Sequence, residues 1–358
     1  MGISGRVILH IDLDDFFASV EAKENPEYAD LPLIISQDLD GKGKVLACNN
    51  KAREMGISQE TPIVTAREKY PNAVYCVVNM PLYKRISEDI ANILRSHADA
   101  LQQVSINEFF IDASIQCLDI QGGLELAKRI REEIKDIFQL TCSIGIAPNK
   151  TVAKMASQMN RPDAITAIEQ DKVREFLSSQ PVHALPGIGE KTKSKLREFG
   201  IQTIAQLAKV PESDLVQEFN VWGTRLHYLA NGIDTSEVKE EEGIRSVTRY
   251  HTFEEDVYDT DELRAVLGHL MDESFDTLKK DNLKPRTVGV KIRFQDFETH
   301  TKDRTRSMVY KNAQDAKETA YQLLEIFLNS NKRIKLVGIR LSNVEPATST
   351  QKTVEEFF

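Results

Sequence analysis

One stretch of the sequence, IDTSEVKEEEG at 233–243, divides the chain into two parts. It is acidic, contains few apolar residues and follows neither a helical nor a strand period, so it predicts a solvated linker over 234–244. A segment of this kind cannot contribute to a hydrophobic core, and 358 residues are enough for two or three domains. We therefore expect the parts before and after it to fold around separate cores.

The part after the linker, residues 245–344, alternates strand and helix patterns in the order β-α-β-β-α-β. Strands are predicted at 246–254, in TVGVKIRF, at 306–310 and in IKLVGIRL, and helices at 261–280 and 312–328. The following residues, NVEPATST, are expected to form a loop, and the end of the chain has no core to join.

The TVGVKIRF segment predicts a sheet with two different faces. Val288, Val290, Ile292 and Phe294 would face the core, because alternate residues of a strand point to the same side. The opposite face would carry four cations, Lys291, Arg293, Lys335 and Arg340. Such a face either follows a phosphate backbone or is simply solvated, and the pattern favours neither explanation.

The part before the linker predicts an α+β body followed by a small helical unit. A first strand is expected at 7–12, a helix at 125–138 and another core strand in TCSIGIA. The helix would bury one apolar stripe, made of Leu126, Ile130, Ile134 and Ile137. Residues 169–233 change to short helices, which we expect to form a unit of their own.

Composition excludes several classes of protein. The net charge is −9, from 46 basic and 55 acidic residues, and no segment is strongly basic, so charge alone does not indicate a nucleic-acid partner. The apolar run at 7–11 is too short for a signal peptide or a membrane span, which favours a cytoplasmic protein without membrane contact. Four widely spaced cysteines, Cys48, Cys76, Cys117 and Cys142, predict neither a zinc site nor disulfides.

Two short acidic segments are candidates for chemistry. In HIDLDDFFASVE, Asp12 and Asp14 lie on one side of a strand end, where carboxylates attract a hard cation such as Mg²⁺. The alternative is that Asp14 or Asp15 caps the next helix. In VSINEFFID, Glu108 lies among apolar residues, where a carboxylate requires a metal or a charged partner.

Together DLDDFFASVE, SINEFFID and SIGIAPNKTVAKMAS resemble the Y-family translesion DNA polymerases, in the DNA polymerase IV branch. The resemblance extends over the whole chain, because PGIGEKTKSKL is similar to the family's helix-hairpin-helix thumb and 245–344 to its little finger. It implies an α+β multidomain fold shaped like a right hand. The expected parts are palm (1–15 and 79–168), fingers (16–78), thumb (169–233), little finger (245–344) and tail (345–358).

The resemblance also implies roles for individual residues. Asp12 and Glu108 would bind two Mg²⁺ ions per site, and Leu13 would offer its backbone carbonyl. Phe17 matches the aromatic residue that rejects a 2′-hydroxyl on the incoming sugar, although Phe16 and Phe17 could also be core residues. Arg53 and Arg161 match residues that contact the triphosphate.

Three positions depart from the family pattern. Asn107 stands where an aspartate bridges both metals, Asn50 where a tyrosine contacts the triphosphate, and Arg161 where lysine is usual. Loss of the carboxylate at Asn107 affects the chemical step, whereas Asn50 would weaken nucleotide binding modestly. Asn107 is explained by an engineered substitution that traps a substrate complex, by a polymerase that tolerates fewer charges, or by a homologue that has lost catalysis.

The thumb motif LPGIGEKTKSKL predicts contact with a DNA phosphate. A glycine turn at Gly187 and Gly189 would let backbone N–H groups approach the phosphate, with Lys191, Lys193 and Lys195 nearby. The alternative is an ordinary glycine-capped connection between two helices.

The segment QKTVEEFF at the end of the sequence resembles the peptide that binds PCNA-type sliding clamps. Val354, Phe357 and Phe358 would form an apolar plug on one helical turn, and Gln351 a polar anchor. The alternative is that the two phenylalanines fold back onto the body.

The sequence therefore predicts a monomeric, low-fidelity translesion polymerase that extends a primer on a DNA template with deoxynucleoside triphosphates. Its partners would be primer-template DNA and a sliding clamp, at the nucleoid of an archaeon or in the nucleus of a eukaryote. The first alternative is a catalytically silent scaffold that binds DNA and the clamp. The second, a nucleotide cyclase with a palm fold, shares the carboxylates but requires no thumb, little finger or clamp peptide.

Overall fold

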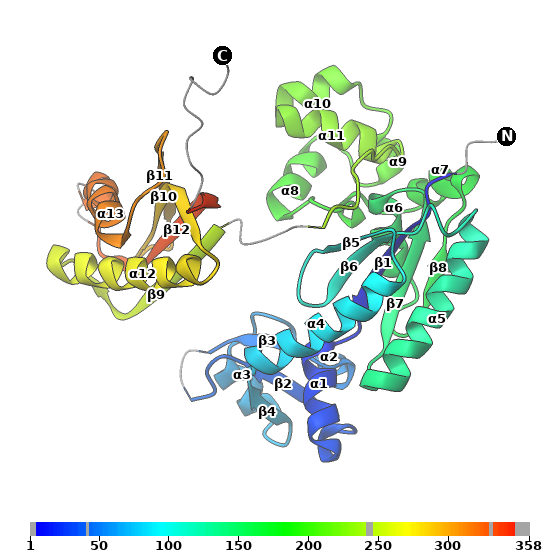
Figure 1. The fold of residues 1–358 in the computed structure, drawn as a ribbon, viewed down its shortest axis with the longest axis horizontal. Coiled ribbons are helices and arrows are strands. Elements are labelled where there is room, and N and C mark those ends of the chain that lie inside the picture. The colour runs from blue at the N-terminus through cyan, green and yellow to red at the C-terminus, as the bar shows by residue number, and fades with distance from the viewer. Residues whose placement is uncertain (1–4, 41–42, 241–245, 329–331, 348–358) are drawn as a thin grey trace. The chain divides into compact units, whose positions relative to one another are not determined.

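The computed structural model describes residues 5–40, 43–240, 246–328 and 332–347. The chain consists of two compact units, Met1–Glu241 and Glu242–Phe358 (Figure 1). Among the described residues, no helix combines the length and the apolar character needed to cross a membrane.

A five-stranded sheet lies at the centre of the first unit, in the order β5-β6-β1-β7-β8. Its strands are β1 (Ile8–Leu13), β5 (Ala100–Gln103), β6 (Glu108–Asp112), β7 (Cys142–Ala147) and β8 (Ile165–Ala167). The central strand β1 is fully buried and pairs antiparallel with both β6 and β7. This register places Asp12 directly opposite Glu108.

The two faces of this sheet have different coverings. Leu9 and Ile11 face the main core with helices α4 (Met80–Ser96) and α5 (Ile120–Phe138), as alternation along a strand requires. The opposite face is covered by α6 (Lys150–Ser157). Gly145 permits this close approach, because a Cβ there would lie 2.0 Å from the carbonyl oxygen of Ala153. The side chain of Asn149 accepts a hydrogen bond from the N–H of Val152 and so begins α6.

Helix α5 differs from its prediction at its first residue and in its apolar stripe, whereas its last residue, Phe138, is as predicted. It begins at Ile120, with Asp119 accepting from the Gly122 N–H, and not at residue 125. The predicted apolar stripe is also wrong at Ile137, which is 54% exposed, because Phe138 is the residue that faces the core. The glycines at 122 and 123 concealed the first turn from a periodicity argument, yet Gly123 packs closely against Val7.

A small three-stranded sheet, in the order β3-β2-β4, lies within residues 16–78. It consists of β2 (Leu33–Ser36), β3 (Val45–Cys48) and β4 (Val74–Val77), with helices α1 (Phe16–Glu24), α2 (Asn50–Glu54) and α3 (Ile63–Lys69). Ile34, Val45 and Ile63 form its own small core. Three of the cysteines are buried and Cys76 is half-buried, and all four are free thiols.

The rest of the first unit is helical, as the sequence predicts for 169–233. Its helices are α7 (Val173–Ser178), α8 (Glu190–Glu198), α9 (Ile204–Leu207), α10 (Glu212–Phe219) and α11 (Val221–Ala230). Their core is continuous with Ile8, Phe110 and Ala147 of the five-stranded sheet. The helices therefore pack directly against this sheet.

The first half of the predicted linker is not free in solvent. The carboxylate of Asp234 accepts hydrogen bonds from the N–H and hydroxyl of Thr151, and Arg6 donates to the carbonyl of Ser236 at 3.1 Å. Val238 is buried in the helical core and Glu240 pairs with Arg95 at 2.7 Å. One buried valine and one well-placed aspartate suffice to dock a segment that composition classes as solvated.

The second unit contains a four-stranded antiparallel sheet in the order β11-β10-β12-β9. Its elements are β9 (Ser246–Val257), α12 (Thr260–Lys280), β10 (Leu283–Phe294), β11 (Thr299–Thr305), α13 (Ala313–Leu328) and β12 (Ile334–Pro346), which is the predicted order. Val288, Val290, Ile292 and Phe294 are buried in one core with α12 and α13.

Two predictions for this unit are wrong. The strand expected at 306–310 lies instead at Thr299–Thr305, and Tyr310 is buried beside α13, where its hydroxyl contacts Thr319. Strand β11 is an exposed edge with a polar sequence, so it has no apolar alternation to detect. The first four residues of the expected loop NVEPATST, 343–346, continue β12 instead, because Val344 and Glu345 pair with β10.

Candidate active site

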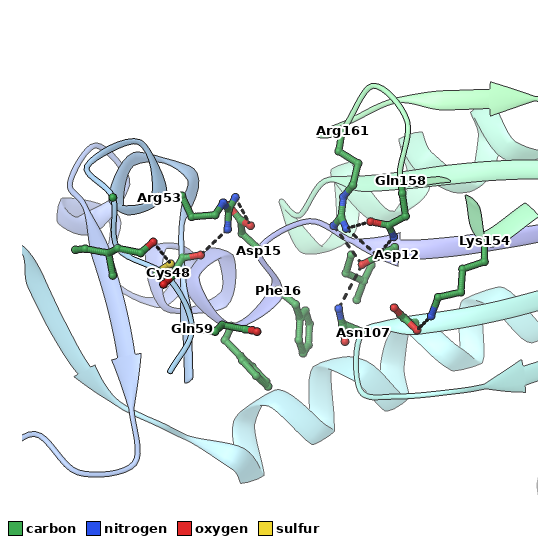
Figure 2. A pocket seen from close by; sticks show the side chains of 17 residues that line it. Asp12, Asp15, Phe16, Cys48, Arg53, Gln59, Asn107, Lys154, Gln158 and Arg161 are labelled. Carbon is green, nitrogen blue, oxygen red and sulfur yellow. Dashed lines mark hydrogen bonds and ion pairs between the residues drawn. The ribbon is translucent and has the colours of Figure 1, made fainter. Parts of the chain in front are cut away.

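A cavity of about 990 Å³ opens in the first unit where β1 ends and α1 begins (Figure 2). One wall comes from the five-stranded sheet and α6, and the other from α1, β3 and the segment that follows α2. Of the eight residues predicted for catalysis, metal binding and nucleotide binding, all except Asn50 line this cavity, namely Asp12, Leu13, Phe17, Arg53, Asn107, Glu108 and Arg161.

Asp12 occupies the end of β1 and is only 3% exposed. Burial raises the pKa of its carboxyl above the ordinary value, and the nearby guanidinium of Arg161 opposes that rise. The neighbouring Leu13 is anchored by its N–H, which donates to the carbonyl of Asn107 at 2.9 Å. The backbone therefore fixes Asp12, Asn107 and Glu108 at one edge of the sheet.

Asn107 points its side chain at Asp12. Its amide nitrogen donates to Asp12 Oδ1 at 3.3 Å, and its amide oxygen accepts from the hydroxyl of Ser105 at 2.9 Å. A carboxylate at this position could not donate to Asp12. Asn107 thus replaces a negative charge by a hydrogen-bond donor.

Glu108 has the charged partner that its strand position requires. Lys154 of α6 donates to Glu108 Oε2 at 2.7 Å. His10 lies behind this pair with its Nε2 4.0 Å from the same oxygen, and burial together with Lys154 lowers the pKa of His10 to about 3. His10 is therefore neutral at physiological pH.

Arg161 bridges the two aspartates of the first motif. Its Nη1 lies 2.9 Å from Asp12 Oδ2, and its Nη2 lies 3.3 Å from Asp14 Oδ1. Gln158 donates to Asp12 as well, at 2.8 Å. Figure 2 shows Arg161, Gln158 and Asn107 converging on Asp12.

Helix capping does not explain the acidic motif. Asp15 occupies the position before α1, but its side chain makes no capping hydrogen bond there and pairs with Arg53 at 2.7 Å. Asp14 is buried and accepts hydrogen bonds from the Ser143 hydroxyl and the Asp163 N–H. The capping alternative is therefore wrong for both residues.

The two phenylalanines that follow have different environments. Both rings line the cavity. Phe16 is 4% exposed and belongs to the main core. Phe17 is half-buried and packs on Tyr83 with ring centroids 4.7 Å apart, so it is the more exposed of the two rings.

Of the two positions expected to contact a triphosphate on α2, only Arg53 reaches the cavity. It also donates to the carbonyl of Cys48 at 2.9 Å, which fixes its direction. Asn50 is exposed, does not line the cavity, and donates to Glu54 at 2.6 Å.

The donor atoms at this edge suit a hard divalent cation. Asp12, Asn107 and Glu108 offer oxygen ligands, and Mg²⁺ is commonly held by one or two carboxylates together with substrate phosphates. However, within the described residues no three side chains of the types His, Cys, Asp and Glu surround a common position. The oxygen ligands are thus of the type that Mg²⁺ prefers, but Asn107 leaves the site with one negative charge fewer than the pattern of the resembled family.

The thumb motif places its glycines in unlike surroundings. Gly187 has a left-handed φ of +91°, and a Cβ there would lie 2.7 Å from the ring of Trp222. Gly189 begins α8 in open space with no side-chain cap. Lys191 and Lys195 line one surface hollow. Lys193 pairs with Glu190 and Lys195 with Glu218, each at 3.0 Å.

In the second unit, Lys291, Arg293 and Arg340 share the sheet face opposite the helices, as the register of β10 and β12 requires. Lys335 lies at an irregularity of the sheet and pairs with Asp256 at 3.6 Å. Tyr250 covers Gly338 on the cationic face, and Lys291 lies 5.0 Å from its ring centroid. The clamp-peptide residues Gln351, Val354, Phe357 and Phe358 lie outside the described residues.

Sequence reasoning missed Lys154, Gln158 and Tyr250. Lys150, Lys154 and Gln158 recur every four residues, so a helical period through KTVAKMASQ predicts one polar stripe facing the carboxylates. Tyr250 is 52% exposed within a strand, and alternation alone does not predict that it lies beside Lys291.

Three family models match the sequence. The impB/mucB/samB family matches residues 11–158, the C-terminal domain of that family matches 244–354, and a thumb domain described for DNA polymerase-iota matches 183–234.

Similar proteins cover nearly the whole chain. A DNA polymerase IV of Methanoculleus marisnigri is 39% identical over 100% of both chains, and DNA polymerase IV 2 of Methanosarcina mazei is 36% identical over 98% of this chain and 96% of its own. Among solved structures, a chimera of the Y-family DNA polymerases Dbh and Dpo4 has a TM-score of 0.87 and 26% identity, covering 95% of this chain and 99% of its own. An insertion ternary complex of Dbh DNA polymerase has a TM-score of 0.69 at the same identity and coverage.

Proposed function

We propose that this protein, which belongs to the impB/mucB/samB family of Y-family DNA polymerases, extends primers across damaged template, and that Asn107 slows its chemical step. By family it is a DNA-directed DNA polymerase of the DNA polymerase IV kind. The observation that carries this proposal is the position of Asn107, which donates to Asp12 in the cavity that also contains Glu108. We assign palm, fingers, thumb and little finger to the ranges expected from the sequence.

In this proposal Asp12 and Glu108 hold Mg²⁺ with the Leu13 carbonyl, and Asn107 contributes a neutral oxygen. Bound Mg²⁺ would neutralise the charge that develops during phosphoryl transfer and orient the triphosphate. Arg53 and Arg161 bind the triphosphate, and the Phe17 ring packs against the sugar. The Gly187–Gly189 turn and the cationic face of the little finger contact DNA phosphates without reading the sequence of bases.

A second candidate, a silent scaffold that binds DNA and a clamp, is favoured by the same site. Each carboxylate in the cavity already has a cationic partner within the protein, so the fold is satisfied without metal. For both candidates we propose that Gln351, Val354, Phe357 and Phe358 bind a PCNA-type clamp.

Primer extension by this protein and by Asn107→Asp decides between the candidates. In the polymerase the parent extends primers measurably with Mg²⁺ or Mn²⁺, and the variant is about 10²–10³-fold faster because a third carboxylate returns. In the scaffold only the variant extends primers. Equal affinity of both proteins for primer-template DNA is the control, and a variant as inactive as the parent would refute the assignment of this site.

A matched variant at the second departure separates binding from chemistry. Asn50→Tyr restores an aromatic hydroxyl beside Arg53, so it should lower KM for the nucleotide about 3–10-fold and leave kcat nearly unchanged. A change in kcat as large as that of Asn107→Asp would show that Asn50 also acts in the chemical step.

A further inference from the structure

The carboxylate of Asp12 has no free acceptor position in this structure. Its Oδ2 accepts from Arg161 Nη1 at 2.9 Å and from Gln158 at 2.8 Å, and its Oδ1 accepts from Arg161 Nη2 at 3.2 Å and from Asn107 at 3.3 Å. A carboxylate offers about four acceptor positions, and four donors use them. A cation can therefore reach Asp12 only by displacing donors of this chain.

Arg161 is the donor that carries charge, and it has a second anchor. Its Nε and Nη2 lie 3.3 Å from Asp14 Oδ1. Asp14 is 4% exposed and is fixed by Ser143 and by the N–H of Asp163, so it stays in place when Arg161 moves. The guanidinium can leave Asp12 and keep a partner.

The same side chain faces the cavity where a triphosphate would lie. The side chain of Arg161 is 29% exposed and lines the cavity, whereas that of Asp12 is 4% exposed. A polyphosphate offers a planar guanidinium several anionic oxygens, and such bidentate pairs are among the strongest hydrogen bonds in proteins. Arg161 can therefore be drawn from the carboxylate toward a polyphosphate.

We propose that Arg161 is an internal cation that occupies Asp12 in place of a metal, and that a bound polyphosphate releases it, so that polyphosphate and metal binding are coupled through this one side chain. The inference rests on the proposed function, since it concerns the same site. Asn107 helps to keep a metal away from Asp12, because it donates a hydrogen bond to Asp12 where a carboxylate could not. Coupling of this kind is reciprocal and is commonly about 5–150-fold in affinity.

The first test measures Mn²⁺ alone, without DNA or nucleotide, by electron paramagnetic resonance. Arg161→Gln should bind Mn²⁺ about 5–50-fold more tightly than the parent, because Asp12 is freed. Arg53→Gln is the matched control, because it removes the same charge from the same cavity, but native Arg53 pairs with Asp15 and not with Asp12. The Mn²⁺ affinity of this control should stay within about 2-fold of that of the parent. Equal effects of the two variants, or none, would overturn the proposal.

Arg161→Lys keeps the result interpretable if Arg161→Gln does not fold. Lysine retains the positive charge but cannot bridge both oxygens of Asp12 while contacting Asp14, so its Mn²⁺ affinity should lie between those of the parent and Arg161→Gln. If Arg161→Lys binds Mn²⁺ no better than the parent, the proposal that Arg161 competes with the metal for Asp12 is wrong.

The second test measures binding of tripolyphosphate in the presence of a chelator. Asp12→Asn should bind it about 5–20-fold more tightly than the parent, because Arg161 is released. In an Arg161→Gln background the same substitution should give less than about 2-fold, whereas a general charge effect would persist in both backgrounds. Neither test requires polymerisation, so inactivity of Asn107→Asp would refute the proposed function and leave these outcomes to decide the coupling separately.

Discussion

Two sheets of this protein each pack one face against a pair of helices, α4 and α5 in the first unit and α12 and α13 in the second. Their other faces differ. In the first, Asp12 is buried and Glu108 is half-buried on the face that α6 covers, and both are held by internal cationic partners. In the second, Lys291 and Arg340 lie on a face that no described helix of its unit covers.

The difference teaches how burial distributes function among residues. A buried charge interacts strongly with a few fixed neighbours, so removal of one group leaves another without compensation. Exposed charges are screened by water and salt, so each contributes little and the contributions add. We therefore expect single substitutions to be decisive in the first sheet and gradual in the second.

The largest effect is expected at Asp12. In the Asn107→Asp background, Asp12→Ala should lower single-turnover nucleotide incorporation at least about 10³-fold, or about 4 kcal/mol, because the cation loses a carboxylate ligand. Affinity for primer-template DNA should change less than about 2-fold. If the rate of incorporation stays within tenfold of that of Asn107→Asp alone, single substitutions in the first sheet are not decisive and the contrast between the two sheets is wrong.

On the cationic face of the second sheet the effect should build up residue by residue. Lys291→Ala, Arg293→Ala and Arg340→Ala should each weaken DNA binding about 2–4-fold and together about 10–50-fold, and the salt slope should fall by about 0.9 for each phosphate that is no longer neutralised. Lys302→Ala is the control, because Lys302 pairs with Val290 and so belongs to the other face. One substitution that accounts for the whole loss would show that this face also has a single decisive residue.

Asp234 extends the comparison to stability. Burial acts to raise the pKa of its carboxyl, but hydrogen bonds from Ser236 and Thr151 outweigh burial and leave the pKa below the ordinary value. A lowered pKa stabilises the fold when the pH is above the pKa that the carboxyl has in the unfolded chain. This stabilisation is lost as the pH falls through the pKa of the folded state. Asp234→Asn should therefore cost about 1.5–3 kcal/mol at pH 7 in denaturant unfolding, and progressively less below about pH 4. A cost that does not vary with pH would assign the effect to packing.

The smallest effects contrast two glycines of one turn. Gly187→Ala should cost about 1–3 kcal/mol in unfolding free energy, because the residue has a left-handed φ and Trp222 occupies the space of a Cβ. Gly189→Ala should cost less than about 1 kcal/mol, because nothing lies within 4 Å of its Cβ position. Similar losses at both glycines would show that backbone freedom, and not packing, governs this turn.

Much of the architecture could be predicted because periodicity reports burial directly. The second unit has the predicted order of elements, and the helices and core strands lie within a few residues of their predicted positions. The differences from prediction have different causes. Strand β11 is polar and the first turn of α5 contains two glycines, so neither shows an apolar period. The segment after Ile233 is held by Thr151 and Arg6, which are distant in sequence and which a local pattern cannot detect.

The candidate site divides in the same way. The sequence by itself determined which groups carry charge and at which strand end they lie, because Asp12 and Glu108 are acidic residues that stand in apolar runs. Only the tertiary structure decided their partners. The antiparallel register sets Asp12 opposite Glu108, and the chain brings Arg161 and Lys154 back to neutralise them. The physical reason is that the strength of an ion pair depends on distance and burial, and both are set by the packing of segments far apart in the chain.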